Sequence, residues 1–393
     1  MSSHYIIFTE QNYSFLFDNK KLLNLITLLF LKSMHLKYLS ISQYKNISYK
    51  TYDFESKINC FIGDNGKGKS NILDAIYNLS FGKSYFNTVA VQNIQFGKDY
   101  YTIEGRYDRE NQELKILSAI KKGQKKILKK NGKIYDKISD HIGLIPTVII
   151  TPADRNLILE GSETRRKFID GVIGQTNSLF LQKLIDYNKI LIQRNSLLKF
   201  FYLNNTFDSN TIDIYNKQLV ERSQLIFEKR KEFLENFVPV FKRFYKYISG
   251  ENENISLNYE SHLFDDSHIS LLEKSIKKDR IVQYTSTGIH KDDIIFLLEK
   301  NPIKKFGSQG QQKTFLIALK LAQFEFLKNQ TGQSPILLFD DAFDKLDQNR
   351  VTQIISLVDE KNFGQIFITD THKDRILKAL KKIKSSFEIH KLI

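Results

Sequence analysis

The apolar and polar positions along the chain predict an α/β fold whose strands come from distant parts of the sequence. Short, mostly apolar runs at Ile58–Ile62, Ile336–Phe339 and Ile366–Ile368 are bounded by polar residues, which is typical of strands buried in a sheet. The helix expected after the first run has one apolar face, formed by Ile72, Ala75, Ile76 and Leu79. The fold must therefore bring the two ends of the chain together.

The middle of the chain, from about Arg165 to about Gly250, has the apolar spacing of long helices. The apolar positions are Leu181, Leu184, Ile185, Leu191 and Ile192, then Leu219, Leu225, Ile226, Phe233 and Phe237. The polar stretch Asn204–Asn210 between them predicts a turn, so we expect an antiparallel helical pair. These helices are too short, and lack the sustained heptads, for a long coiled coil. They predict a compact arm.

The first 33 residues contain one run that resembles a targeting signal. Lys20 and Lys21 precede the apolar run Leu22–Leu31, but this run is too short to span a bilayer and no small-residue cleavage site follows it. We expect residues 1–33 to be an extension, either a genuine appendage or the product of a start assigned too early. We also expect a cytoplasmic protein with no membrane partner.

The composition favours an acidic partner. The chain has 59 Lys and Arg residues against 44 Asp and Glu residues, a formal net charge of +15, and the phosphate backbone of nucleic acid is the obvious acidic partner. Biased codon usage is another explanation for the many Lys, Asn, Ile, Phe and Tyr residues. The single cysteine, Cys60, excludes a disulfide framework within the chain, and no Cys or His cluster has the spacing of a structural zinc site.

A phosphate-binding loop is predicted between the first strand and its helix. The residues expected to bind a nucleoside triphosphate are Gly63, Asp64, Asn65, Gly66, Lys67, Gly68, Lys69 and Ser70, which fit the pattern GxxxxGK[ST]. Glycines let backbone N–H groups turn toward the phosphates, and the helix N-terminus adds a positive dipole. Lys69 is expected to reach the terminal phosphates and Ser70 to bind Mg²⁺. A plain glycine turn is the alternative.

Two carboxylates, Asp340 and Asp341, follow the strand Ile336–Phe339. In a phosphate-loop ATPase the first is placed to hold Mg²⁺ and the second to orient the attacking water. Taken alone, the segment also fits an ordinary core strand that ends at a polar turn.

Residues 307–313, Gly-Ser-Gln-Gly-Gln-Gln-Lys, open an amphipathic helix. Its apolar positions are Phe315, Leu316, Leu319, Ala322 and Phe326. Ser308 has the position of an N-cap, and a serine cap, a glycine and a helix N-terminus together form an anion site. This site would face a phosphate that the first loop does not hold. A well-capped helix without a ligand is the alternative.

The order of these motifs, followed by Leu346-Asp347 and by Thr371-His372, resembles that of an ABC-type ATPase head. The stretch Ser308–Lys313 with Ala318–Ala322 is more specifically similar to the RecF family of bacterial recombination mediators. Other similar blocks lie at Met34–Leu39, Tyr44–Asn46, Thr151–Asp154, Gly161-Ser162, Arg165-Arg166 and Gly288–Asp293. Together the blocks span almost the whole chain.

This resemblance implies an α/β, ABC-type head of mixed sheet and helices, formed by residues 34–164 and 285–393, with a mainly helical arm over residues 165–284. Two heads would enclose two ATP molecules with Mg²⁺, which makes the protein an ATP-dependent homodimer and a weak, DNA-stimulated ATPase. The ATP-bound dimer would bind double-stranded DNA beside single-stranded gaps and help RecO and RecR load RecA. The expected processes are recombinational repair, replication restart and the SOS response.

The resemblance also implies roles for single residues. Lys45 and Asn46 would bind nucleotide, and His372 would sense the γ-phosphate, acting in catalysis with Lys69 and Asp341. Asp347 would form the D-loop. The signature residues Ser308, Gln309, Gly310 and Gln311 would act on the nucleotide of the other subunit.

Several positions depart from the family pattern. Lys45 and Lys291 stand where arginine is usual, so a bidentate fork becomes a point charge. Ile289 replaces a proline, and Asp344 stands where ABC heads carry serine. Asp341 replaces the usual ABC glutamate, in keeping with RecF, and suits slow hydrolysis. No convincing Q-loop glutamine is present, so the sequence does not identify the residue that couples nucleotide binding to closure of the two lobes.

Six lysines surround two predicted hairpin turns of the first lobe: Lys121, Lys122, Lys125, Lys126, Lys129 and Lys130. The second turn carries an Asn-Gly signal. Flexible lysines suit sequence-independent contacts with DNA phosphates. A solvated edge hairpin, protected from aggregation by its charge, is the alternative.

Two other functions fit the sequence poorly, and a third stays possible. A transporter ATPase subunit would usually carry the full Leu-Ser-Gly-Gly-Gln signature and a clear Q-loop. An OLD-like nuclease needs a further acidic metal domain after the head, for which the short segment after His372 leaves no room. A structural DNA-binding role without turnover follows if Asp341 is badly placed.

Overall fold

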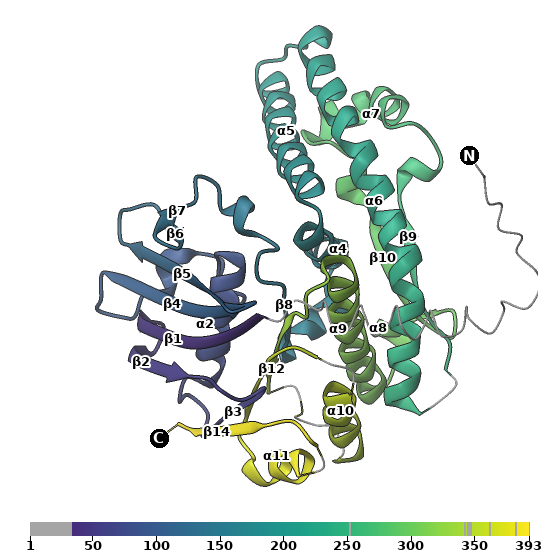
Figure 1. Ribbon diagram of the computed structural model, residues 1–393. Coiled ribbons are helices and arrows are strands. Elements are labelled where there is room, and N and C mark those ends of the chain that lie inside the picture. The colour runs from purple at the N-terminus through teal and green to yellow at the C-terminus, as the bar shows by residue number, and fades with distance from the viewer. Residues whose placement is uncertain are drawn as a thin grey trace, which may run out of the picture.

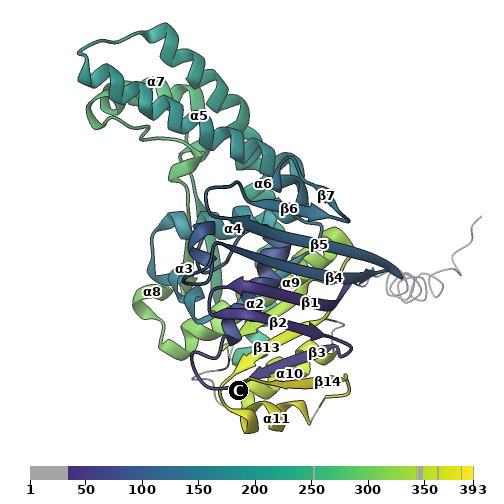
Figure 2. The same ribbon diagram turned by 90° about the vertical axis from the view of Figure 1, so that its left-hand side faces the viewer.

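The computed structural model describes residues 34–250, 253–341, 343, 348–360, 363–381 and 383–392. A body of sheets and helices carries a long arm of helices that projects away from it (Figures 1 and 2). The expected extension 1–33, Asp344, Leu346 and the D-loop residue Asp347 lie outside the described residues. No helix of the described part is long and apolar enough to cross a membrane.

The three predicted strands form the centre of a parallel sheet of order β14-β3-β13-β12-β8. Its strands are β3 (Ile58–Ile62), β8 (Thr147–Ile150), β12 (Ile336–Asp340), β13 (Ile366–Asp370) and β14 (Phe387–Lys391). All residues of the four strands β3, β8, β12 and β13 are buried, which explains the continuous apolar runs. Because the strands are parallel, the segments that follow β3, β12 and β13 all leave at one edge of the sheet.

A second, antiparallel sheet of order β2-β1-β4-β5-β6-β7 lies on the other side of helix α2 (Lys69–Phe81). Its strands are β1 (Met34–Tyr44), β2 (Ile47–Asp53), β4 (Tyr100–Arg109), β5 (Gln112–Lys121), β6 (Ile127–Lys130) and β7 (Lys133–Ile134). The predicted apolar face of α2 is buried, and so are Leu73 and Asp74, because the helix contacts both sheets. The buried amide of Gln365 joins the sheets, since it accepts from the Leu36 N–H at 2.7 Å and donates to the Leu36 carbonyl at 3.0 Å.

The arm contains the predicted antiparallel helical pair, α5 (Ser178–Leu203) and α6 (Ser209–Ser249), which lie side by side (Figure 1). The side chain of Asp208 caps α6 by accepting from the Asn210 N–H at 2.9 Å. With its 41 residues, α6 reaches from the arm back to the body. The neighbouring elements are α4 (Ser162–Thr176), α7 (His268–Val282) and the antiparallel strands β9 (Ile255–Glu260), β10 (Asp293–Leu298) and β11 (Asn301–Pro302).

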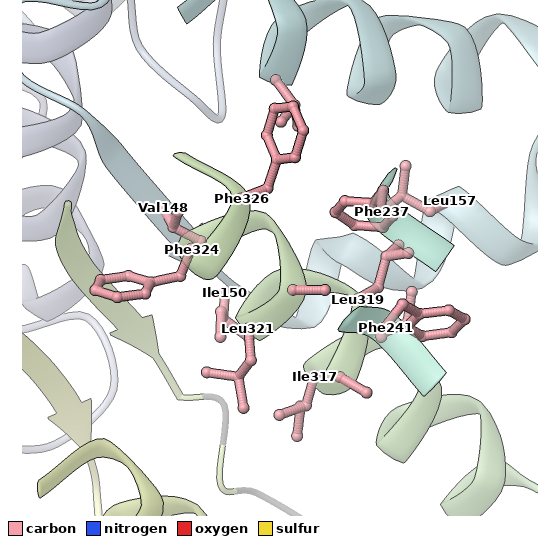
Figure 3. Close-up of a cluster of buried hydrophobic side chains, with 14 of the residues drawn as sticks. Val148, Ile150, Leu157, Phe237, Phe241, Ile317, Leu319, Leu321, Phe324 and Phe326 are labelled. Carbon is pink, nitrogen blue, oxygen red and sulfur yellow. The ribbon is translucent and has the colours of Figure 1, made fainter. Parts of the chain in front are cut away.

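Helix α9 (Gln309–Thr331) is the helix that follows the serine-glycine motif. All five predicted apolar positions are buried, but so are Ile317, Leu321 and Phe324, because α9 packs against α6 on one side and β8 on another (Figure 3). Aromatic rings pair along the contact between α6 and α9. The ring centroids of Phe233 and Phe326 are 4.8 Å apart, and those of Phe241 and Phe315 are 4.7 Å apart. The signature helix and the arm helix are therefore one packed unit.

Two arginines, the buried Arg230 and the partly buried Arg165, fix the base of the arm to the block Gly288–Asp293. Arg230 forms a fork with both carboxylate oxygens of Asp170, at 2.9 and 2.8 Å, and also donates to Asp292 Oδ2 at 2.8 Å. Arg165 forms a second fork with Asp293, with both contacts at 2.8 Å. Two blocks that carry the family resemblance thus form the junction between arm and head.

The remaining elements are short or lie near the C-terminal end. They are η1 (Ala90–Asn93), η2 (Ile138–His141), η3 (Pro152–Arg155), α3 (Asn156–Leu159), η4 (His262–Phe264), η5 (Ile289–Lys291), α8 (Ile303–Phe306), α10 (Gln348–Glu360) and α11 (Lys373–Leu380).

Candidate nucleotide site

The predicted phosphate loop connects β3 to α2 at the shared edge of the parallel sheet. Gly66 and Gly68 have φ angles of +83° and +89°, a region that favours glycine. A Cβ atom on Gly68 would lie 2.9 Å from the Asn46 side-chain oxygen. No side chain caps the start of α2, so its first N–H groups can point to an anion. The loop has the conformation and the open helix end that a phosphate needs.

Lys69 is the buried cation of this loop, with 4% of its surface exposed. Its ammonium group donates to the carbonyl oxygens of Gly63 at 2.8 Å and Asp64 at 3.0 Å. Asp64, Asn65, Gly66 and Lys67 are exposed. The loop therefore presents an exposed rim above a buried ammonium group.

Asn46 and Lys45 reach this region from the end of the first hairpin, in two different ways. The Asn46 amide donates to the Gly66 carbonyl at 2.7 Å and accepts from the Asn71 amide at 2.7 Å, so it holds the loop in place. The Lys45 ammonium group lies 2.5 Å from the buried carboxylate of Asp74 in α2. In this structure Lys45 thus contacts α2 rather than the loop itself.

Asp74 is a residue that the sequence reasoning missed. It is fully buried and also accepts hydrogen bonds from the Tyr44 hydroxyl at 2.6 Å, the Ser84 hydroxyl at 2.7 Å and the Tyr85 N–H at 2.7 Å. The only sequence signal was an acidic residue inside the apolar stretch of α2. Such a residue needs several partners when it is buried.

The end of β12 places Asp340 beside the loop. Asp340 is 4% exposed; burial raises the pKa of its carboxyl, and side-chain hydrogen bonds from Ser70 and Thr369 oppose this rise. The Thr369 hydroxyl of β13 donates to Asp340 Oδ1 at 2.9 Å. A serine hydroxyl and a carboxylate are oxygen ligands of the kind that Mg²⁺ takes, with phosphates and water completing its shell. The predicted pair Ser70 and Asp340 fits this ion.

Asp341 leaves the strand in a left-handed conformation, with a φ angle of +43°. Its N–H donates to the Thr369 hydroxyl at 2.9 Å, so one threonine contacts both predicted carboxylate residues. Asp341 lines a cavity of about 290 Å³ together with Gln309 and Gly310 of the signature segment. Thr369 had no distinctive sequence signal, because its role depends on the pairing of β12 with β13.

His372 follows β13 at the same edge of the sheet. Its side chain is 71% exposed, its N–H donates to Asp370 Oδ1 at 2.7 Å, and Nδ1 lies 2.9 Å from the Thr371 hydroxyl. The imidazole is thus held on one side and open to solvent on the other.

The signature segment has the predicted capping geometry. The Ser308 hydroxyl accepts from the Gln311 N–H at 3.2 Å, and the Gln311 side chain accepts from the Ser308 N–H at 2.7 Å, which forms a capping box. Ser308 and Gln309 are exposed, and Gly310 is partly exposed. The N-terminal end of α9 is therefore accessible from outside the subunit.

The basic hairpins differ in part from the prediction. Lys121, Lys122 and Lys125, here called the hairpin lysines, are exposed, whereas Lys129 and Lys130 are partly buried along β6. Lys126 turns inward and donates to the Asn78 side-chain oxygen in α2 at 2.9 Å, and burial lowers the pKa of its ammonium group to about 8. An inward Lys126 is a poor DNA contact, because its ammonium group is already bound within the fold.

Comparison with known sequences finds a family match and similar proteins over almost the whole chain. The family described as RecF/RecN/SMC N terminal domain matches residues 35–392. The DNA replication and repair protein RecF of Flavobacterium johnsoniae is 57% identical over 359 residues, covering 91% of this chain and 100% of that protein. The protein of the same name from Phocaeicola vulgatus is 46% identical, covering 91% of this chain and 96% of its own length.

Comparison with solved structures also finds RecF. The structure of the recombination mediator protein RecF-ATP in the RecFOR pathway is 30% identical, with a TM-score of 0.82 over 92% of this chain and 96% of that chain. An Smc head domain from Pyrococcus furiosus, 16% identical with a TM-score of 0.53, covers 88% of this chain and 92% of that chain and shares the fold alone. These findings confirm the predicted α/β, ABC-type head. The chain belongs to the RecF family of DNA replication and repair proteins.

Proposed function

We propose that this protein is an ATPase that dimerises on ATP, binds double-stranded DNA beside single-stranded gaps, and supports RecA loading with RecO and RecR. The observation that carries this proposal is the meeting of the phosphate loop, Asp340, Asp341 and Thr371-His372 at one edge of the parallel sheet. Nucleotide-dependent DNA binding in the cytoplasm during repair, replication restart and the SOS response fits a RecF family member with a net charge of +15.

In the proposed mechanism each residue acts on the phosphates or on the water that attacks them. Lys69 leaves the loop carbonyls and stabilises the charge of the transferring phosphoryl group. Ser70 and Asp340 would hold Mg²⁺, which would supply positive charge to neutralise the phosphates. Asp341 orients the attacking water, and His372, exposed at the same edge, senses the γ-phosphate.

The dimer follows from the division of the site between two ends of the molecule. Ser308, Gln309, Gly310 and Gln311 form an accessible helix end, which we propose binds the γ-phosphate held by a second subunit. Asp347 would complete that contact. A triphosphate bridges the subunits and a diphosphate does not, so the dimer equilibrium shifts by the difference in affinity between the two nucleotide states. Hydrolysis, slow and DNA-stimulated, then acts as a timer for release.

We propose that the hairpin lysines contact the DNA backbone, with the arm of residues 165–284 gripping the duplex. The hairpin lysines are exposed and cluster around one turn. Contacts of this kind are independent of sequence and weaken steeply with salt.

The test is binding of the full chain to gapped duplex DNA with ATP, with ADP and without nucleotide, together with the oligomeric state under each condition. The variant Lys69→Ala removes the buried ammonium group, and Lys37→Ala, which removes an exposed lysine of β1 outside the predicted site, is the matched control. We expect ATP-dependent dimerisation and DNA binding in the parent protein and in Lys37→Ala, and neither in Lys69→Ala. Equal DNA binding in every nucleotide state, or a dimer of Lys69→Ala, would refute the proposal.

A further inference from the structure

A buried ion pair joins the signature helix to the segment that follows β8. The Lys320 ammonium group of α9 lies 2.7 Å from Asp154 Oδ1, and both residues are at most 4% exposed. Asp154 belongs to η3 and holds the start of that turn, because its Oδ2 accepts from the Thr151 N–H at 2.7 Å. The carboxylate is therefore fixed to the end of a strand of the parallel sheet.

The same carboxylate also receives a contact from the nucleotide side of the head. The Tyr85 hydroxyl donates to Asp154 Oδ1 at 2.7 Å, and the Tyr85 N–H donates to Asp74, the carboxylate that also binds Lys45. Lys45 directly precedes Asn46, which holds the phosphate loop. Polar contacts, joined at one point by the peptide bond between Lys45 and Asn46, thus lead from the phosphate loop to the middle of α9.

Asp154 is among the residues that line two cavities. One cavity of about 290 Å³ lies between Asp154 and the signature residues Gln309 and Gly310. A second cavity, of about 330 Å³, is lined by Tyr85, Asp154 and Lys320. Where apolar packing is interrupted by cavities, a buried charged contact has a large share in fixing the position of a helix. Small changes of this contact can then change the direction of α9.

We propose that Asp154 is a positioning residue that sets the orientation of signature helix α9 relative to the phosphate loop, through Tyr85 on one side and Lys320 on the other. This inference rests on the proposed ATP-dependent dimer. It assigns to Tyr85, Asp154 and Lys320 the coupling for which the sequence offers no convincing Q-loop glutamine. Because α9 packs on α6, a change in α9 also moves the arm.

A positioning role is separable from a structural one. Removing one partner of a buried ion pair destabilises a protein, whereas replacing both partners is often tolerated. The test variants are therefore Tyr85→Phe, which removes one hydroxyl, and the double variant Asp154→Asn/Lys320→Met. The matched control is Arg194→Met/Asp279→Asn, which removes a fully buried ion pair of 2.8 Å inside the arm. ATP affinity, thermal unfolding and the ATP-dependent dimer dissociation constant are measured for each full-length variant.

We expect both test variants to bind ATP within about threefold of the parent protein, but to lose about tenfold or more in ATP-dependent dimerisation, a coupling of ordinary size. The arm control should keep the parent's dimer constant even where its unfolding temperature falls. Dimerisation of the test variants at the parent's level, or an equal loss in the arm control, would overturn the positioning role. An equal loss of ATP affinity would do so too, by assigning these residues to nucleotide binding. A parent protein without an ATP-dependent dimer would instead refute the proposed function, and this inference with it.

Discussion

Acidification should destabilise the junction between arm and head through two histidines, His268, which is buried, and His290, which is partly buried. Burial lowers the pKa of His268 to about 4 and that of His290 to about 3, and the positive charges of Arg194 on His268 and of Lys291 and Arg166 on His290 add to the effect. His290 Nδ1 lies 2.9 Å from the Tyr187 hydroxyl oxygen, and His290 Nε2 lies 2.9 Å from the Thr285 carbonyl oxygen. Both rings are therefore held in their neutral form inside the fold.

The free energy of unfolding depends on pH because the folded and the unfolded chain bind different numbers of protons. Between pH 6.5 and 4 the unfolded chain protonates these histidines while the folded chain does not, so the free energy of unfolding falls as the pH falls. Each pH unit below the ordinary pKa of 6.5 costs about 1.4 kcal/mol per histidine, which gives about 2 kcal/mol each and about 4 kcal/mol together at pH 5. Domains are typically stable by about 5–15 kcal/mol, so the loss is a large part of the total.

Urea unfolding at pH 7.5 and pH 5, followed by circular dichroism, measures this loss. The control is the double variant His268→Gln/His290→Gln, whose amides cannot titrate. His35, His141 and His390, whose pKa values burial also lowers, remain in both proteins. The parent should lose about 4 kcal/mol more than the variant over this pH range. Equal losses, or an NMR titration of either imidazole near pH 6.5, would refute the reasoning.

Three further results are expected. Thr369→Val removes the hydroxyl that contacts both Asp340 and the Asp341 N–H, so ATP turnover should fall about 10–100-fold with ATP affinity nearly unchanged; unchanged turnover would contradict this role. Gly68→Ala introduces a Cβ 2.9 Å from a neighbouring oxygen at a φ of +89°, which strains the loop by roughly 1–2 kcal/mol. Calorimetry should therefore show ATP binding weakened about tenfold or more. The control Gly171→Ala lies in an exposed part of α4 with open space around it, so it should keep ATP affinity and gain about 0.5–1 kcal/mol of stability. Replacing the three hairpin lysines by alanine should make the plot of the logarithm of the DNA binding constant against the logarithm of the salt concentration less steep, by about 0.9 in slope per lost phosphate contact. The control Lys126→Met should leave this slope unchanged. A slope as steep as the parent's in the triple variant would place the DNA elsewhere.

Features that depend on local backbone chemistry were determined by the sequence itself. The phosphate loop requires left-handed glycines before a helix, and the structure has them at Gly66 and Gly68. Ser308 caps α9 with Gln311, as the short-range pattern predicts. The buried strands that end at Asp340 and Asp370 were visible as apolar runs, because a strand buried on both faces must be mostly apolar.

Only the tertiary structure decided which distant polar groups meet inside the fold. Gln365 binds Leu36 across 329 residues of sequence, and the partners of Asp74, Asp154 and Thr369 come from other elements of the head. Each is an ordinary polar residue in its local stretch, and burial forces it to find a partner that only packing can supply. Lys126 shows the reverse case. It belongs to a basic run in the sequence, yet its ammonium group donates to Asn78 of α2 just before β6 begins, a contact that only the packing of the hairpin against α2 provides.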